Sequence, residues 1–224
     1  MLALSGVAFA VLFLIGWFAS GGDAPDYTAP DQDWATWAED NQWKSRVGAF
    51  AMLLAGFLFL HYAGTIRSAL GRAEASVRGS AQLAHVAFAG AITGMAGMAM
   101  AIVIISGADT EGAGANPIVT RAVASASAGP FLVSAMGFAA FLMPAGLLTL
   151  QSGVFARWTG VVALIVAALI GAVSFLVTFA AVLSGLGEDS LFGFGFFPGV
   201  LALVIWSAAT SIALSQAATR AAET

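Results

Sequence analysis

Long apolar runs separated by short polar segments make up most of this chain. Six of the runs have about the 20 residues that an α-helix needs to cross roughly 30 Å of hydrocarbon. They contain no Asp, Glu, Lys or Arg, and they cover residues 2–19, 47–66, 83–106, 130–150, 160–183 and 199–217. The pattern predicts an all-α fold, in which residues 1–224 form one transmembrane domain, a bundle of six membrane-spanning helices.

Two of the connecting segments stand out from this pattern. Residues 20–46 form an acidic loop that holds six of the twelve acidic residues and three of the six tryptophans. Asp31 or Asp33 is a suitable helix N-cap, so we predict a short interfacial helix in this loop. One face of that helix would carry Trp34, Trp37, Ala38, Asn41 and Ser45. The second connection, residues 107–129, is rich in small residues and is expected to be flexible.

The composition indicates that this protein lies in a lipid bilayer. Hydrophobic residues make up 60% of the chain and charged residues 9%, with a mean hydropathy of +0.92. A soluble domain carries about 25% charged residues. The net charge of −4 argues against nucleic acid as a partner, since that role calls for clustered Lys and Arg. The absence of cysteine excludes disulfides and thiolate metal sites.

The basic residues indicate the orientation of the chain in the bilayer. With a cytoplasmic N-terminus, five basic residues lie inside and three outside, in the sense of the positive-inside rule. The inner ones are Arg67, Arg72, Arg78, Arg157 and Arg220, and the outer ones are Lys44, Arg46 and Arg121. We therefore expect both termini to be cytoplasmic. The first run lacks the basic start of a signal peptide, so we expect an uncleaved helix, while a native start upstream of Met1 stays open.

Two histidines are the ionisable side chains within the apolar runs. His61 lies six residues before Arg67, and His85 lies in the first turn of the third run. Antiparallel neighbouring helices would bring the two rings to a similar depth, where a pair of imidazoles could hold a b-type haem. They could also bind zinc or copper. The interpretation we favour is structural, with no cofactor and no metal site, because no carboxylate is placed to orient either ring.

Small and hydroxyl-bearing residues form faces on two of the predicted helices. The third run has a close-packing face formed by Ala87, Gly90, Gly94 and Gly97. The sixth run has a hydroxyl stripe formed by Ser207, Thr210, Ser211 and Ser215. This stripe either bonds neighbouring helices together or lines a path for a polar solute. Pro144 is expected to kink the fourth run.

Parts of the sequence resemble a group of multi-pass membrane proteins from high-GC Gram-positive, actinobacterial-type bacteria. The resemblance rests on "WKSRVGAFAMLLAGFLFLHYAGTIRSALGRAE", "LAHVAFAGAITGMAGMAMA" and "PAGLLTLQSGVFARWTG". It covers most of the chain but rests on compositional texture rather than on a catalytic motif. It implies a six-helix bundle in a bacterial plasma membrane, and it carries over no functional residues.

These observations favour a protein without enzymatic activity, because the apolar runs lack the carboxylates that ion pumps and aspartyl intramembrane proteases use. We expect an accessory or scaffold subunit, or a homo-oligomer, that makes contact through the tryptophan-rich loop. The tryptophans of this contact surface are Trp34, Trp37 and Trp43. The alternatives are a passive or weakly coupled carrier of a small solute that uses the hydroxyl stripe, and a b-haem electron carrier that uses His61 and His85.

Overall fold

Every regular element that the structure describes is an α-helix, which confirms the all-α class. The structure is a computed structural model that describes residues 4–20, 25, 29–107, 116–184 and 189–222. The helices are α1 Ser5–Ala19, α2 Asp31–Arg78, α3 Gln82–Gly107, α5 Pro117–Ala126, α6 Ala128–Ser152, α7 Arg157–Ser184 and α8 Asp189–Ala222. The start of the first predicted run (1–3) and part of the acidic loop (21–24 and 26–28) lie outside the described residues.

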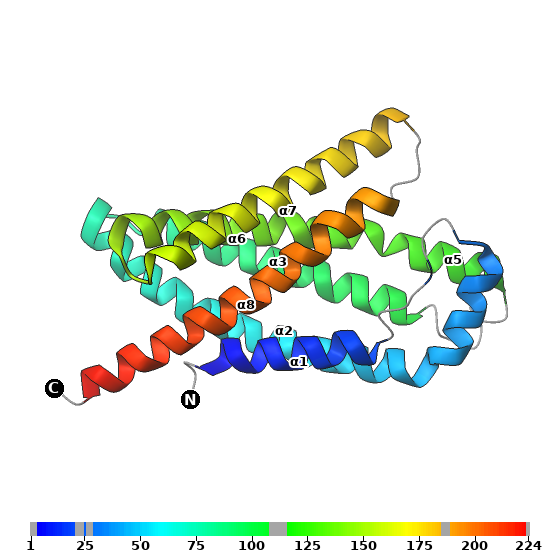
Figure 1. Cartoon of the computed structure of the whole chain (residues 1–224), viewed down its shortest axis with the longest axis horizontal. Coiled ribbons are helices and arrows are strands. Elements are labelled where there is room, and N and C mark those ends of the chain that lie inside the picture. Colours follow the sequence, from blue (N-terminus) through cyan, green and yellow to red (C-terminus); the bar gives the residue numbers. More distant parts are fainter. Residues whose placement is uncertain (1–3, 21–24, 26–28, 108–115, 185–188, 223–224) are drawn as a thin grey trace.

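Six of these helices pack in a closed ring, with α5 lying across one end (Figure 1). Each of α1, α2, α3, α6, α7 and α8 packs against the next, and α8 packs back against α1. The start of α1 and the end of α8 lie at the same end of the bundle, and α5 lies at the opposite end. The two ends of the bundle therefore differ, and the chain returns to the end from which it starts.

Among the described residues, four helices are long and apolar enough to cross a membrane, which supports a helical membrane protein. They lie within Asp31–Arg78, Gln82–Gly107, Pro117–Ser152 and Gly199–Gln216. Two shorter apolar helical segments, Ser5–Ala19 and Arg157–Ala172, belong to α1 and α7. The count of six spans and the cytoplasmic position of both termini therefore stay predictions.

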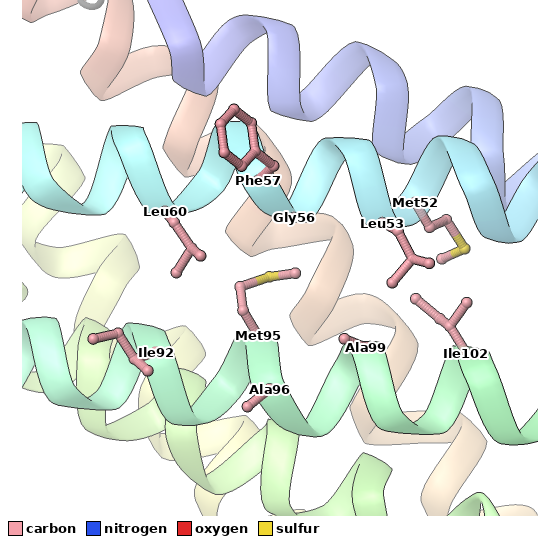
Figure 2. A pocket seen from close by; sticks show the side chains of 10 residues that line it. All are labelled: Met52, Leu53, Gly56, Phe57, Leu60, Ile92, Met95, Ala96, Ala99 and Ile102. Atoms are coloured by element: carbon pink, nitrogen blue, oxygen red, sulfur yellow. The ribbon is translucent and has the colours of Figure 1, made fainter.

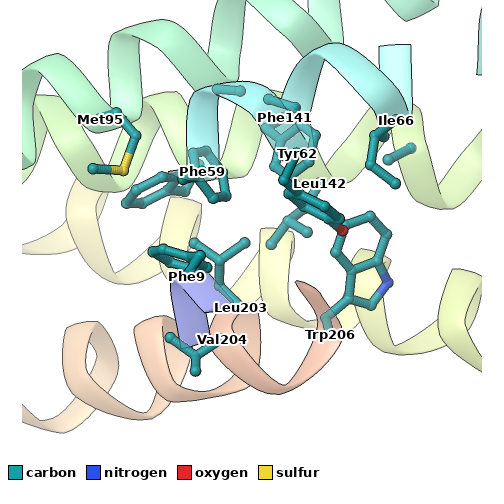
Figure 3. Close-up of a cluster of buried hydrophobic side chains, with 14 of the residues drawn as sticks. Phe9, Phe59, Tyr62, Ile66, Met95, Phe141, Leu142, Leu203, Val204 and Trp206 are labelled. Carbon is teal, nitrogen blue, oxygen red and sulfur yellow. The ribbon is translucent and has the colours of Figure 1, made fainter. Parts of the chain in front are cut away.

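Aromatic side chains from four helices fill the middle of the ring (Figure 3). Phe59 of α2 is completely buried, and its ring centroid lies 4.9 Å from that of Phe9 in α1. Phe141 of α6 meets Phe59 and Trp206 of α8 edge-on, at centroid distances of 5.8 and 5.6 Å. Such edge-on pairs contribute about 0.5–1.5 kcal/mol each beyond their buried area. In lipid, where helices associate through packing, this cluster is a main source of cohesion.

Helices α3 and α6 approach each other at backbone distance. A Cβ atom built on Gly90 would lie 2.5 Å from the backbone nitrogen of Phe141, and one on Gly97 would lie 2.6 Å from that of Ser134. A Cβ on Gly94 would lie 2.6 Å from the ring of Phe138. Ala87, the fourth residue of the predicted close-packing face, is also buried. This face of α3 therefore packs inside the chain, and its glycines set the spacing of the two helices.

A helical cap covers the α5 end of the ring. The predicted interfacial helix is the first part of the 48-residue helix α2, and it crosses the end of the bundle before the chain turns into the ring (Figure 1). Trp34, Trp37 and Ala38 pack there with Ala124 of α5. An ion pair of 2.9 Å between Asp31 and Arg121 joins the same two helices.

The helix α5 corrects the prediction of a flexible connection for its second half, while residues 108–115 lie outside the described residues. Pro117–Ala126 is helical because its N-terminus is well capped. The Asn116 side chain accepts hydrogen bonds from the backbone N–H groups of Ile118 and Val119, at 3.1 and 3.4 Å. Pro117 occupies the first helical turn, where its fixed φ favours the helix and its missing N–H is not needed.

Candidate functional site

An apolar groove lies between α2 and α3 on the outside of the ring. Its volume is 330 Å³, which is at the lower end of the range of ligand pockets, about 300–1,000 Å³. Leu53 and Leu60 point from α2 toward α3, while Met95 points back toward α2 (Figure 2). The full lining is Met52, Leu53, Gly56, Phe57, Leu60, Ile92, Met95, Ala96, Ala99 and Ile102. An apolar lining of this kind accepts a hydrocarbon chain or the side of another helix.

A cluster of Arg67, His85 and Phe88 lies beyond one end of this groove, toward the connection between α2 and α3. The Arg67 guanidinium carbon lies 5.2 Å from the centroid of the Phe88 ring, a cation–π distance. Arg67 Nη2 and His85 Nε2 are 2.9 Å apart, and His85 Nδ1 lies 2.7 Å from the carbonyl oxygen of Ala81. A carbonyl only accepts and a guanidinium only donates, so His85 is the neutral tautomer with its proton on Nδ1.

The two histidines do not fit a b-type haem as they stand. Both ring nitrogens of His85 are engaged, and ligation of an iron through Nε2 would displace Arg67. The exposed His61 ring packs edge-on against Phe57, with 4.7 Å between the ring centroids. Among the described residues, no group of three His, Cys, Asp or Glu side chains could hold a metal ion.

Comparison with known proteins adds no information about the function of this chain. No family model, curated protein or solved structure matches the chain.

The hydroxyl stripe of α8 lies in the packed interior of the ring. Ser207, Thr210 and Ser211 are fully buried, and Ser215 is partly buried. Tyr62 Oη of α2 lies 2.5 Å from Thr210 Oγ1, which in turn donates its proton to the Trp206 carbonyl at 2.7 Å. Tyr62 is therefore the donor in the first of these bonds. The three buried hydroxyls lie where α1, α2 and α8 meet, so their position is that of a helix-to-helix contact.

Ser207 and Trp206 complete the polar contacts around this stripe. The Ser207 hydroxyl lies beside Tyr62 but makes no hydrogen bond of good geometry. Trp206 Nε1 donates to the carbonyl oxygen of Thr159 at 2.9 Å, which ties α8 to α7. The solute path stays a prediction, while the bond from Tyr62 to Thr210 holds α8 to α2 and the bond from Trp206 to Thr159 holds it to α7.

Glu74 is a buried carboxylate that sequence reasoning missed. Its two oxygens accept hydrogen bonds from the backbone N–H groups of Leu83 and Ala84, at 3.0 and 2.9 Å. These groups belong to the first turn of α3, where the helix dipole favours a negative charge. Glu74 therefore fixes the hairpin between α2 and α3, which positions Arg67 and His85. In the sequence it looks like one more solvated charge of a basic connection.

The three tryptophans of the acidic loop have two different environments. Trp34 and Trp37 are 2% and 9% exposed, because α5 covers them. This burial corrects the prediction that they present a contact surface. Trp43 is 67% exposed, and Glu39 and Asp40 are exposed beside it. The two buried indoles hold the cap in place, while the exposed indole and acids face outward.

Proposed function

We propose that this protein is a non-enzymatic membrane protein that works as an accessory or scaffold subunit. Its contact surface is the exposed side of the cap, formed by Glu39, Asp40 and Trp43. The observation that carries the proposal is the exposure of a large indole on a polar helix that is itself anchored to the bundle. This assignment keeps the acidic loop as the contact region, retains Trp43 of the predicted contact surface, and leaves out Trp34 and Trp37.

The anchoring of the cap supports this proposal. Interface residues contribute most when they are already rigid, because little side-chain and backbone entropy is then lost on binding. Here Trp34 and Trp37 fix the helix on Ala124 of α5. The ion pair between Asp31 and Arg121 adds little energy, since both side chains are 38% exposed, but it sets the direction of the helix.

The chemistry of the exposed face supports a protein partner with basic residues. Tryptophan is enriched among interface residues that contribute 2 kcal/mol or more, on the order of a thirtyfold change in affinity. The two neighbouring acids, Glu39 and Asp40, would pair with Lys or Arg of the partner beside Trp43, and the exposed Lys44 next to Trp43 would pair with an acid. A partner membrane protein with Lys or Arg at the same membrane face, or a second copy that presents such residues, would satisfy both features.

The test is a native mass spectrum of the protein extracted from its own membrane in mild detergent. We expect additional mass from a second polypeptide or a second copy. The fraction of protein in this complex should fall at least tenfold in Trp43→Ala and in Asp40→Lys. The matched control is Trp158→Ala, which removes an indole that is 55% exposed at the start of α7, far from the cap. A wild-type protein found only as a monomer, or a complex that both cap variants retain, would overturn the proposal.

A further inference from the structure

We propose that the groove between α2 and α3 binds one acyl chain of an anionic phospholipid, whose phosphate sits on Arg67. This site is separate from the contact surface on the cap and does not depend on it. The inference rests on the alignment of the groove with the Arg67, His85 and Phe88 cluster, on the depth of that cluster, and on the charge around it.

The groove and the cluster lie along the same faces of the two helices. On α2, Leu53, Phe57 and Leu60 line the groove, and the same alternation of four and three residues continues through Gly64 to Arg67. On α3, Ile92 lines the groove, and steps of four and three residues lead back to Phe88 and His85. Residues at such spacings share one helix face. The contacts of Arg67 with His85 and Phe88 therefore bridge the two faces at the end of the groove.

The depth of Arg67 matches that of a phosphate. Gly56, in the groove, lies near the middle of the apolar run 47–66, and Arg67 is the first charged residue after this run. Eleven residues of helix rise about 16 Å, and half of the hydrocarbon thickness is about 15 Å. With the groove near the bilayer centre, the guanidinium is at the level of the lipid headgroups.

The charge around Arg67 favours an anion. The last part of α2, after the apolar run, carries Arg67, Arg72 and Arg78, and its single acid is Glu74. Both oxygens of Glu74 are bound to the N-terminus of α3. Within the part of the chain that the structure describes, Arg67 has no carboxylate partner. Its bond to His85 leaves further guanidinium N–H groups for phosphate oxygens, and the Phe88 ring holds the guanidinium in place.

An amphiphile with an anionic head and a hydrocarbon tail therefore matches the whole feature. Phosphate recognises the guanidinium, and the tail fills a groove whose small residues, Gly56, Ala96 and Ala99, leave room beside the helices. A zwitterionic phospholipid offers the same tail, but its own ammonium group offsets the phosphate charge. We expect about a fivefold preference for the anionic lipid, in line with the effect of one arginine near an anionic membrane surface.

The test is lipid retention by the delipidated full-length protein, measured by native mass spectrometry at matched collision energy. The probes are phosphatidylglycerol and phosphatidylcholine with identical acyl chains. We expect one saturable copy of phosphatidylglycerol, with Arg67→Gln lowering its retention about fivefold. We expect Ala99→Phe to remove it, because the added ring fills the groove. Circular dichroism and size-exclusion chromatography check that each variant is folded.

Two controls separate this site from ordinary contact with the bilayer. Arg72→Gln removes an exposed arginine on another face of the last part of α2, and Ala168→Phe adds a ring at an exposed alanine of α7. Both should retain the lipid as the wild type does. Equal losses in Arg67→Gln and Arg72→Gln, equal retention of the two lipids, or full retention in Ala99→Phe would overturn the proposal. A lipid-free dimer that Ala99→Phe abolishes would overturn it too, since the groove would then hold a second copy.

Discussion

Adding one methyl group at Gly90 should separate two helices, whereas the same change at Gly64 should not. A Cβ atom at Gly90 would meet the Phe141 nitrogen at 2.5 Å, the Ala140 carbonyl carbon at 2.7 Å and the Gly137 oxygen at 2.8 Å. All three are backbone atoms of α6, so no side-chain rotation relieves the overlap. A Cβ at Gly64, inside α2, has no neighbouring atom within 4 Å. The two substitutions are chemically identical and differ only in what the methyl group meets.

The expected magnitudes follow from two opposing effects. Overpacking a well-packed core costs about 1–3 kcal/mol, and replacing glycine by alanine inside a helix stabilises it by up to about 1 kcal/mol. We therefore expect Gly90→Ala to lower the free energy of unfolding by about 1–2 kcal/mol, and Gly64→Ala to leave it unchanged or raise it slightly. Gly56→Ala should fall between them, because its Cβ would meet only the flexible end of Met95, at 2.7 Å.

The assay is reversible unfolding by sodium dodecyl sulfate in mixed micelles, followed by far-UV circular dichroism. Gly97→Ala repeats the perturbation about two helical turns away, since its Cβ would also meet backbone atoms of α6 at Ser134 and Pro130. A Gly90→Ala variant as stable as Gly64→Ala would refute the idea that backbone contact sets the spacing of α3 and α6. The order Gly64, Gly56, Gly90, from least to most destabilised, is the specific expectation.

Two other predictions concern buried polar groups and use the same unfolding assay. Glu74→Ala should lower the free energy of unfolding by about 2–3 kcal/mol, because two N–H groups at the start of α3 lose their acceptor. Glu74→Gln keeps one acceptor oxygen and should lower the free energy of unfolding clearly less than Glu74→Ala. Equal decreases in the two variants would contradict this account. Tyr62→Phe removes the donor to Thr210 and should cost about 0.6–1.7 kcal/mol. A loss above about 3 kcal/mol would show that this hydroxyl supports more than one contact.

Periodicity predicted which residues of the cap share a face but not what covers that face. The spacing of Trp34, Trp37 and Ala38 indicates one apolar side of a helix, and these side chains are buried together. Their neighbour α5 is far away in the sequence, and residues 107–129 suggested a flexible connection. The one local signal for α5 is Asn116 followed by Pro117, an N-cap and a first-turn proline. Without a visible partner for this apolar face, the sequence predicts an outer surface.

The candidate lipid site shows the same division between local pattern and distant contact. The steps of four and three residues from Leu53 to Arg67 are visible in the sequence, and so is the first charge after the apolar run. The sequence does not show that α3 packs against α2 and brings His85 and Phe88 into contact with Arg67. The role of Glu74 is equally hidden, because its burial depends on where α3 begins relative to the end of α2. Spacing along one helix was predictable, and pairing between helices was not.

The contact of α3 with α6 also has a consequence for how the protein is made. The two helices do not emerge from the ribosome together, since the end of α6 at Ser152 follows the end of α3 at Gly107 by about 45 residues. At synthesis rates of about 5–20 residues per second, the ribosome completes α6 roughly 2–9 s after it completes α3. Throughout that time its glycine face is turned toward lipid and toward any other nascent chain. The fidelity of assembly therefore depends on how fast translation delivers α6, and slowing translation between these two helices should favour wrong pairings without any change in the sequence.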